Sequence, residues 1–180
     1  MTAVQPRTTR VLNLGAGKDR APAGATTIDI VARTNPDIVH DLNERPWPLA
    51  SDAYDLIYCK DVIEHLDDVI GTLEEIHRVA ADGATVVITT PHFSCANSYT
   101  DPTHRHHLGI RSFDYVTGEN QWDFYTATRF RKQRASIVFH GSWKNKLIWR
   151  IAARAPDFYE RHLAWIFPAW FLYVELVVVK

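Results

Sequence analysis

Apolar residues in the first half of the chain fall into short runs with turn residues near their ends. The runs lie at residues 10–14, 25–30, 37–42, 54–59 and 84–90 and are rich in Val, Ile, Leu and Thr. Runs of this length and composition, bounded by Gly, Pro, Asn or Asp, are typical of strands. The pattern therefore predicts five short, buried, parallel strands.

Between Asp67 and Asp82 the apolar residues recur at intervals of three and four. They are Val69, Ile70, Leu73, Ile76, Val79 and Ala80. This spacing predicts an amphipathic helix that ends at the Asp-Gly pair. Strands that alternate with helices imply right-handed crossovers and a mainly parallel sheet, with ligands at the carboxyl ends of the strands. The residues predicted along that edge are Gly15, Asp29, Asp41, Cys59 and Pro91.

The C-terminal third adds two predicted strands, at residues 134–140 and 170–180. They are expected to pair antiparallel and to complete a sheet of seven strands. Only residues 18–24 lie between the first glycine turn and the second strand, so the first helix is expected to be very short. The predicted fold is α/β: a doubly wound, mostly parallel seven-stranded sheet with a short first helix and an antiparallel C-terminal strand.

Composition narrows the class of protein. The chain has 180 residues, 46% of them apolar, which is enough for one core, so residues 1–180 are predicted to form a single domain. The 20 Lys and Arg nearly balance the 21 Asp and Glu, which argues against a nucleic-acid partner. The two cysteines, Cys59 and Cys95, lack a metal-ligand spacing, and no apolar leader precedes the first strand. A cytoplasmic location is therefore expected.

The segment between the last two predicted strands is basic and rich in tryptophan. Its apolar run from Leu163 to Val174 is too short to cross a bilayer and contains Pro168, so no transmembrane segment is predicted. Peripheral contact with a membrane, or a homodimer contact through this Trp-rich segment, stays open. Burial against the sheet is the interpretation that we favour.

The first predicted strand runs directly into Gly15-Ala16-Gly17. Glycine has no Cβ and adopts positive φ readily, so such a turn lets the backbone approach a ligand closely. A dinucleotide site would need a third glycine and a long helix, yet Arg20 stands at the third glycine position. An ordinary tight turn is the alternative.

This turn and three later motifs together resemble the class I S-adenosylmethionine-dependent methyltransferases, of the compact type 11 sort. The motifs span residues 10 to about 115 and read "VLNLGAGKDR", "TTIDI", "VHDLNERPWPLASDAYDLIYCKDVIEHLDD" and "EEIHRVAADGATVVITTPHFS". Their order and spacing carry the resemblance, because a G-x-G alone is a weak signal. The turn "ADGA" departs from the family's usual "KPGG". The resemblance implies an enzyme that uses S-adenosylmethionine, and it makes residues 91–130 and 141–169 acceptor-side insertions.

S-adenosylmethionine has no phosphates, and its binding needs a close backbone approach, an acid for the ribose hydroxyls and an apolar slot for adenine. The glycine turn offers the approach, Asp29 is placed to accept from both ribose hydroxyls, and Asp41 with Leu42 is placed for the adenine. Alternatively, Asp29 only shapes a turn and Asp41 pairs with Arg33 or Arg45.

The motif "DVIEHL" resembles the family motif after the fourth strand. Its His65 is a candidate for the cofactor site, or it caps and packs the next turn. The full set of candidate cofactor residues is Leu14, Gly15, Ala16, Gly17, Asp29, Ile30, Asp41, Leu42, Cys59 and His65.

Methyl transfer to a hydroxyl needs a base, whereas a free amine needs little help. The segment "PHFSCANSYTDPTHRHHLGIRSFDY", residues 91–115, follows the fifth strand and is dense in histidine. Its "DPTH" is similar to the D-P-T-H segment of the type 11 group. Histidine oriented by a carboxylate suits base catalysis near neutral pH, so we predict His92 or His104 as base, with Asp101 orienting it. The candidate substrate residues are Tyr99, His106 and His107.

Each of these histidines could instead stabilise its loop. A zinc or hard-metal site built from His92, Asp101, His104 and His107 is a further alternative, and no required metal is predicted. The predicted function is S-adenosylmethionine-dependent O-methylation of a hydroxyl on a sugar, glycan or glycosylated natural product. The alternatives are a cofactor-binding but inactive scaffold or regulatory module, and a methyltransferase for an amine or carboxylate of a small molecule.

Overall fold

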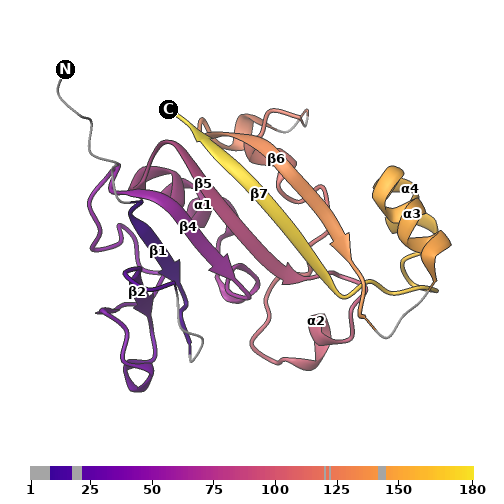
Figure 1. The fold of residues 1–180 in the computed structure, drawn as a ribbon, viewed down its shortest axis with the longest axis horizontal. Helices are drawn as coiled ribbons and strands as arrows, with labels where there is room; N and C mark the ends of the chain where they lie inside the picture. Colours follow the sequence, from indigo (N-terminus) through magenta and orange to yellow (C-terminus); the bar gives the residue numbers. More distant parts are fainter. Residues whose placement is uncertain (1–8, 18–21, 120, 122, 142–144) are drawn as a thin grey trace.

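The structure is a computed structural model that describes residues 9–17, 22–119, 121, 123–141 and 145–180. Within these residues, seven strands form one sheet in the order β3-β2-β1-β4-β5-β7-β6 (Figure 1). The strands are β1 (Val11–Leu14), β2 (Thr26–Asp29), β3 (Ile38–Val39), β4 (Tyr54–Lys60), β5 (Ala80–Pro91), β6 (Arg129–Val138) and β7 (Phe171–Val179). Neighbouring strands from β3 to β5 are parallel, and β7 runs antiparallel to both β5 and β6. The predicted α/β fold class is confirmed.

The helices are short. They are α1 (Val69–Val79), α2 (Asn97–Thr100), α3 (Lys146–Arg154) and α4 (Pro156–His162), with 3₁₀ turns η1 (Ala32–Thr34), η2 (Ile63–His65), η3 (Asp114–Val116) and η4 (Asp123–Tyr125). Figure 1 shows α3 and α4 side by side beyond the end of β6. The predicted first helix falls partly on residues 18–21, which lie outside the described residues.

Several element boundaries differ from the sequence predictions. Helix α1 ends at Val79 and β5 begins at Ala80, because Ala80 adopts an extended backbone and pairs with Tyr54 across the sheet. The irregular step that follows includes Gly83 at φ +73°, so the Asp-Gly pair bends a strand and does not end the helix. Strand β3 keeps only two of the six predicted residues. Strand β6 begins five residues before the predicted position 134 and ends two before 140.

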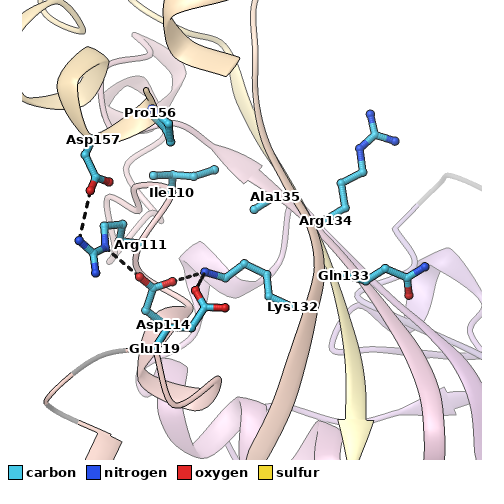
Figure 2. A pocket seen from close by; sticks show the side chains of 10 residues that line it. All are labelled: Ile110, Arg111, Asp114, Glu119, Lys132, Gln133, Arg134, Ala135, Pro156 and Asp157. Carbon is cyan, nitrogen blue, oxygen red and sulfur yellow. Dashed lines mark hydrogen bonds and ion pairs between the residues drawn. The ribbon is translucent and has the colours of Figure 1, made fainter. Parts of the chain in front are cut away.

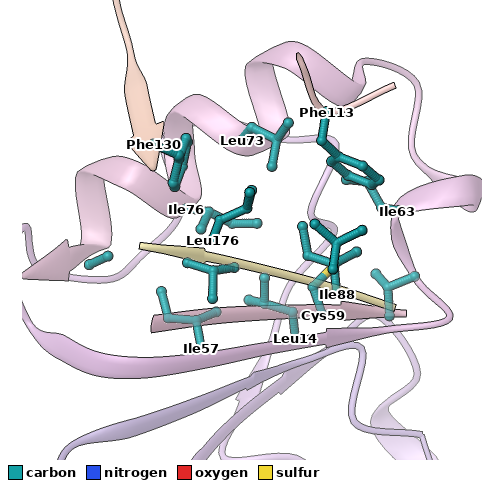
Figure 3. Close-up of a cluster of buried hydrophobic side chains, with 14 of the residues drawn as sticks. Leu14, Ile57, Cys59, Ile63, Leu73, Ile76, Ile88, Phe113, Phe130 and Leu176 are labelled. Carbon is teal, nitrogen blue, oxygen red and sulfur yellow. The ribbon is translucent and has the colours of Figure 1, made fainter. Parts of the chain in front are cut away.

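The main core lies between the sheet and α1. Alternate residues of the central strands share one face, and on it Leu14, Cys59 and Ile88 stand in register and are fully or almost fully buried. Figure 3 shows these side chains beneath Leu73 and Ile76 of α1. This apolar layer holds the carboxyl ends of β1, β2 and β4 in place.

The alternate positions point to the opposite face of the sheet. There the registered residues are Asn13, Tyr58, Val87 and Glu175, of which Tyr58 and Glu175 are partly exposed. A second, smaller apolar cluster joins α3 and α4 around the fully buried Tyr159. The C-terminal helices therefore have a small core of their own beside the sheet.

Candidate active site

A cavity of about 560 Å³ opens at the carboxyl ends of β1 to β4. Small-molecule and cofactor sites in proteins commonly measure about 300–1,000 Å³. The residues around it are Gly15, Asp29, Ile30, Val31, His40, Asp41, Leu42, Asn43, Asp61, Val62, His65, Leu66 and Thr103. Because parallel strands end at the same edge, segments far apart in sequence meet here.

The glycine turn forms one wall of this cavity. Gly15 has φ +58°, and a Cβ placed on it would lie 2.3 Å from Cγ2 of Val62, so only glycine fits there. Its amide donates to the carbonyl of Ile28 at 2.8 Å, which ties the turn to β2. Gly17, at φ +53°, donates its amide to Oδ2 of Asp29 at 2.7 Å. Gly15 thus lines the cavity directly, whereas Gly17 contributes to the cavity only by holding the Asp29 side chain in place.

The Asp29 side chain ends β2 and is buried, with 6% of its surface exposed. Oδ2 accepts from Gly17, and Oδ1 accepts from the amide of Val31 at 2.7 Å. Each carboxylate oxygen has two lone pairs, so both retain one for a further donor. The two backbone bonds therefore fix a carboxylate that can still receive two hydroxyl groups.

Asp41 and Leu42 follow the short strand β3. Oδ1 of Asp41 accepts from the amide of Asn43 at 2.9 Å, and Leu42 is buried against the main core. Arg45 pairs with Asp68 at 2.9 Å, so it does not take up the Asp41 carboxylate as the alternative interpretation had it. Asp41 and Leu42 thus stand together in the cavity wall, as predicted.

Other predicted cofactor residues lie behind or beside this wall. Leu14 and Cys59 are in the core and Ala16 is nearly buried, and none of the three is among the residues around the cavity. Burial strongly raises the pKa of the Cys59 thiol. Ile30 lines the cavity with 61% of its surface exposed. Cys59 is therefore a packing residue in this structure.

A cluster of three side chains adjoins the cavity next to His65. One possible ligand atom from each of Glu64, His65 and His104 lies within 4.8 Å of the other two, and we call these residues the Glu64 cluster. Glu64 is 1% exposed, and neither carboxylate oxygen has a hydrogen-bond partner in the described part of the chain. Burial raises the pKa of this carboxyl group to about 7, against a smaller lowering by the backbone amide of Glu64 and the buried Thr90 hydroxyl. A buried carboxylate without partners is costly and is often explained by function.

Hydrogen bonds orient both rings of the cluster. Nδ1 of His65 lies 2.9 Å from Oγ1 of Thr103, whose hydroxyl donates to Oδ1 of Asp101 at 2.6 Å. Nδ1 of His104 lies 3.3 Å from the carbonyl of Ser98, which can only accept. In the neutral form, both rings therefore carry the proton on Nδ1 and keep the lone pair on Nε2.

The loop with the "DPTH" sequence is anchored on η2. The amides of Arg105 and His106 donate to the backbone carbonyl of Glu64 at 2.8 and 3.2 Å. This contact brings Nε2 of His104 to 4.0 Å from Oε1 of Glu64 and 3.9 Å from Oδ2 of Asp101. Burial lowers the pKa of His65, and the nearby His104 lowers it further.

The structure does not bring His92 to this site. Its ring is completely buried, with Nδ1 at 2.8 Å from the Ser94 hydroxyl and Nε2 at 3.1 Å from Glu160. It packs on Phe93 and Tyr159 beside the C-terminal helices. Of the two histidines predicted as the base, only His104 stands by the cavity.

The three predicted substrate residues lie outside the cavity wall. Tyr99 stacks on His107 with ring centroids 4.1 Å apart, and Nδ1 of His107 lies 2.8 Å from the Ser98 hydroxyl. His106 has a buried Nε2 with no hydrogen-bond partner among the described residues. The alternative metal set from the sequence is not assembled, because only Asp101 and His104 of its four members meet in the described structure.

Asp61 and Thr103 were not predicted as site residues, and Glu64 was noted only beside His65 in the "DVIEHL" motif. Asp61 adopts φ 54°, lines the cavity, and accepts from the Thr89 hydroxyl at 3.2 Å. The available signal was the D-x-x-E-H pattern of residues 61–65, directly after β4. Its place at the end of a central parallel strand puts the pattern on the ligand-binding edge.

A second cavity, of about 480 Å³, lies beside β6 (Figure 2). Most of its charged side chains pair with one another: Asp114 with Arg111 and Lys132, and Arg111 also with Asp157. Arg134 also lines the cavity and lies over the Tyr173 ring. The ion pairs neutralise most of the charge around this cavity within the protein. We treat it as a structural junction.

The Trp-rich segment is only partly buried. Tyr159 and Ala164 are completely buried in the small core, whereas Trp165 and Ile166 are 67% and 68% exposed. Among the described residues, no helix has both the length and the apolar character needed to cross a membrane. The expectation of burial thus holds for part of this segment.

Comparisons with known proteins match this geometry. A family model described as "Methyltransferase domain" matches residues 2–167. The chain belongs to this methyltransferase family. A comparison with curated proteins finds no match.

Solved structures with the same fold include three S-adenosylmethionine-dependent methyltransferases. The one from Archaeoglobus fulgidus is 16% identical, with 94% of this chain and 86% of that chain covered and a TM-score of 0.62. The one from Mesorhizobium loti is 15% identical, with 94% and 90% covered and a TM-score of 0.56. The one from Aquifex aeolicus is 14% identical, with 95% and 82% covered and a TM-score of 0.56. At these identities the likeness shows the fold.

The predicted class I S-adenosylmethionine-dependent methyltransferase is therefore confirmed, and the protein is an enzyme with S-adenosylmethionine as its expected cofactor. The cavity fits this group. Asp29 offers a fixed carboxylate with acceptor capacity to spare, Leu42, Val62 and Leu66 supply apolar surface, and Gly15 lets the cavity wall come close. No strong positive charge for a pyrophosphate lines the cavity in the described residues.

Proposed function

We propose that this methyltransferase transfers a methyl group to a hydroxyl of a sugar, a glycan or a glycosylated natural product. The observation that carries the proposal is the Glu64 cluster, because two histidine rings and a buried carboxylate adjoin the cofactor cavity. Such groups suit removal of a proton from an oxygen acceptor. An amine acceptor would have little need of them.

The cavity residues divide into cofactor and acceptor sides. Asp29 would hold the ribose, Gly15 would lie beneath the amino-acid part, and Asp41 with Leu42 would hold the adenine. When bound, S-adenosylmethionine supplies an electrophilic methyl group on a sulfonium leaving group. The acceptor oxygen would form a bond to that carbon as the carbon–sulfur bond breaks, and the sulfur would keep the electron pair.

We assign the hydroxyl proton to the cluster at the end of the cavity. His104 is the predicted base that stands there, and Asp101 lies beside its Nε2. The Thr103 hydroxyl links Asp101 to His65, so the carboxylate orients the cluster as well. The acceptor would approach over Thr103 and His65, which both face the cavity.

The test is an acceptor screen. The protein is incubated with S-adenosylmethionine and panels of monosaccharides, oligosaccharides, amines and carboxylates, and release of S-adenosylhomocysteine is measured. We expect turnover with a sugar hydroxyl and a loss of about 10²- to 10⁴-fold in kcat for His104→Ala, with cofactor Kd within about twofold. His162→Ala, which removes an exposed histidine of α4, is the matched control and should keep full activity.

Two results would contradict the proposal. Turnover with amines or carboxylates alone would replace the sugar hydroxyl as acceptor. Tight cofactor binding with no turnover on any panel would favour the inactive scaffold or regulatory module. The cytoplasmic location stays a prediction, as do the membrane and homodimer contacts of the Trp-rich segment.

A further inference from the structure

The Glu64 cluster has the composition of a metal site as well as that of a base. Its three members come from η2 and from the "DPTH" loop, and the ligand atoms of Glu64, His65 and His104 lie within 4.8 Å of one another. A divalent ion with bonds of about 2.1 Å holds its ligands about 3 to 4 Å apart. The three side chains would need to close by on the order of 1 Å, which rotation about their χ angles can supply.

The strongest argument is the state of Glu64. Its carboxylate is 1% exposed, and both oxygens lack a hydrogen-bond partner among the described residues. Oε1 faces Nε2 of His104 at 4.0 Å, which is too long for a hydrogen bond. A cation between these two atoms would satisfy both lone pairs and the buried charge.

The second argument is the orientation of the two rings. Each donates its Nδ1 proton to a neighbour, His65 to Thr103 and His104 to the carbonyl of Ser98. Metal-binding histidines are commonly held in this way, with the second ring nitrogen bonded to a carbonyl or, directly or indirectly, to a carboxylate. Here the chain from His65 through Thr103 ends on Asp101.

We propose that Glu64, His65 and His104 bind one divalent transition-metal ion at the wall of the cofactor cavity. Two imidazoles and one carboxylate favour ions such as Mn²⁺, Fe²⁺, Co²⁺ or Zn²⁺ over Mg²⁺ and Ca²⁺, which prefer oxygen ligands alone. Three protein ligands leave coordination positions open. One of these positions would take the acceptor oxygen, and His65 lies where the cluster meets the cavity.

The role of the ion in catalysis rests on the proposed function, whereas its binding does not. An ion that binds the acceptor hydroxyl would lower the pKa of that hydroxyl, and its proton would pass to solvent water. In the metal-loaded enzyme His104 is then a ligand, and the ion takes over the work of a free base.

The test measures metal binding without any acceptor. Protein stripped with a chelator is titrated with Mn²⁺, and free Mn²⁺ is followed by electron paramagnetic resonance, with Co²⁺ absorption spectra as a second readout. We expect one ion per chain, and at least tenfold weaker binding for Glu64→Gln and for His104→Ala. Thr103→Val, which removes the hydroxyl that orients His65, should weaken binding by about tenfold. His162→Ala and Asp29→Asn should bind the ion as the unaltered protein does.

Thermal unfolding of each variant accompanies the titration. If Glu64→Gln does not fold, His104→Ala carries the test. The inference is overturned if the unaltered protein binds no stoichiometric Mn²⁺ or Co²⁺, or if both cluster variants bind as it does.

Activity with and without chelator separates the two proposals. Full methylation of a sugar hydroxyl by metal-free protein would overturn a catalytic metal while the proposed function stands. Stoichiometric binding lost in the cluster variants, together with no methylation of any acceptor, would support the site and contradict the proposed function alone.

Discussion

Asp29 shows how one side chain connects the glycine turn with the cofactor cavity. Its two oxygens accept from Gly17 and Val31, and the same oxygens face the cavity with lone pairs to spare. Loss of the carboxylate would therefore remove a ligand contact and loosen the turn that shapes the cavity. Both effects act on cofactor binding.

We expect Asp29→Asn to weaken S-adenosylmethionine binding by more than tenfold. Hydrogen bonds to a charged group contribute about 1.5 to 3 kcal/mol. In addition, the NH2 group of the new asparagine would face a backbone N–H group, and two donors cannot form a hydrogen bond. Isothermal titration calorimetry measures the change. Asp82→Asn, at an exposed position beyond α1, is the control and should bind normally. A folded Asp29→Asn protein with unchanged Kd would remove Asp29 from the ribose site.

The two glycines of the turn should respond differently to alanine. A Cβ on Gly15 meets Val62 at 2.3 Å, whereas a Cβ on Gly17 meets only the carbonyl of Gly15 at 3.9 Å. Both variants carry the cost of positive φ, about 1 kcal/mol, and Gly15→Ala adds a steric cost of about 1 to 3 kcal/mol. Urea unfolding should show the larger loss for Gly15→Ala.

A double variant checks the cause. In Gly15→Ala/Val62→Ala the smaller side chain makes room, so the loss should be less than the sum of the two single losses. Equal losses for Gly15→Ala and Gly17→Ala would show that contact with Val62 does not matter.

At the scale of elements, α1 depends on the residue that precedes it, its N-cap. Asp68 is the N-cap: its side chain accepts from the amide of Gly71 at 2.9 Å and also pairs with Arg45. These interactions lower the pKa of Asp68, against an opposing effect of burial. Because α1 covers the main core, its cap supports the sheet that carries the site.

We expect Asp68→Ala to lower the free energy of unfolding by about 1 kcal/mol at pH 7. A carboxyl group whose pKa is lowered by folding stabilises the protein above its ordinary value, about 3.9, and loses that effect as pH falls through the lowered pKa. The difference between Asp68→Ala and the unaltered protein should therefore shrink below about pH 4. Urea unfolding at pH 7 and pH 3 measures it, and a constant difference would contradict this assignment.

At the scale of the whole molecule, one ionic junction ties the segment between β5 and β6 to the edge of the sheet. Asp114, 2% exposed, pairs with Lys132 of β6 and with Arg111, which reaches Asp157 at the start of α4 (Figure 2). Burial lowers the pKa of Lys132, but its bonds with Asp114 and Glu119 outweigh that effect and raise it overall. The junction therefore links η3, β6 and α4.

We expect Asp114→Asn to lower the free energy of unfolding by about 2 kcal/mol, because it leaves a half-buried lysine with one partner, Glu119. Asp157→Asn breaks an exposed pair and should change stability by less than about 0.5 kcal/mol. Chemical unfolding of both variants gives the comparison. Similar small losses for the two would show that the junction is a surface contact in solution.

Local sequence patterns were sufficient for the central sheet, for α1 and for the meeting of Gly15, Asp29, Asp41 and Leu42 at one cavity. A run such as residues 84–90 indicates a strand because its apolar side chains have few other ways to be buried. This inference needs no knowledge of the strands that pair with the run. In the same way, the Gly-x-Gly turn and Asp29 follow two adjacent parallel strands, so chain order alone brings them together. The positions of Gly15, Asp29, Asp41 and Leu42 at one cavity follow from that order.

Elements held by pairing were harder to predict. The added first half of β6 is the polar stretch Arg129–Lys132, which forms a strand because it pairs with Leu176–Val179 of β7. Likewise, Ala80 leaves the helix to pair with Tyr54. In both places hydrogen bonds to a distant segment determine the extended backbone conformation, and the local sequence pattern does not indicate which segment the partner is.

The catalytic side of the site was decided by tertiary structure. The sequence by itself determined that a histidine-rich segment follows β5, but it left two candidates for the catalytic base, His92 and His104. The loop folds back on the Glu64 carbonyl, so His104 joins Glu64 and His65, while His92 is buried against Glu160. Contacts between segments about 40 residues apart depend on the path of the loop and on which side chains are buried. Residue spacing along the chain sets neither of these, so the sequence pattern could not choose between the two histidines.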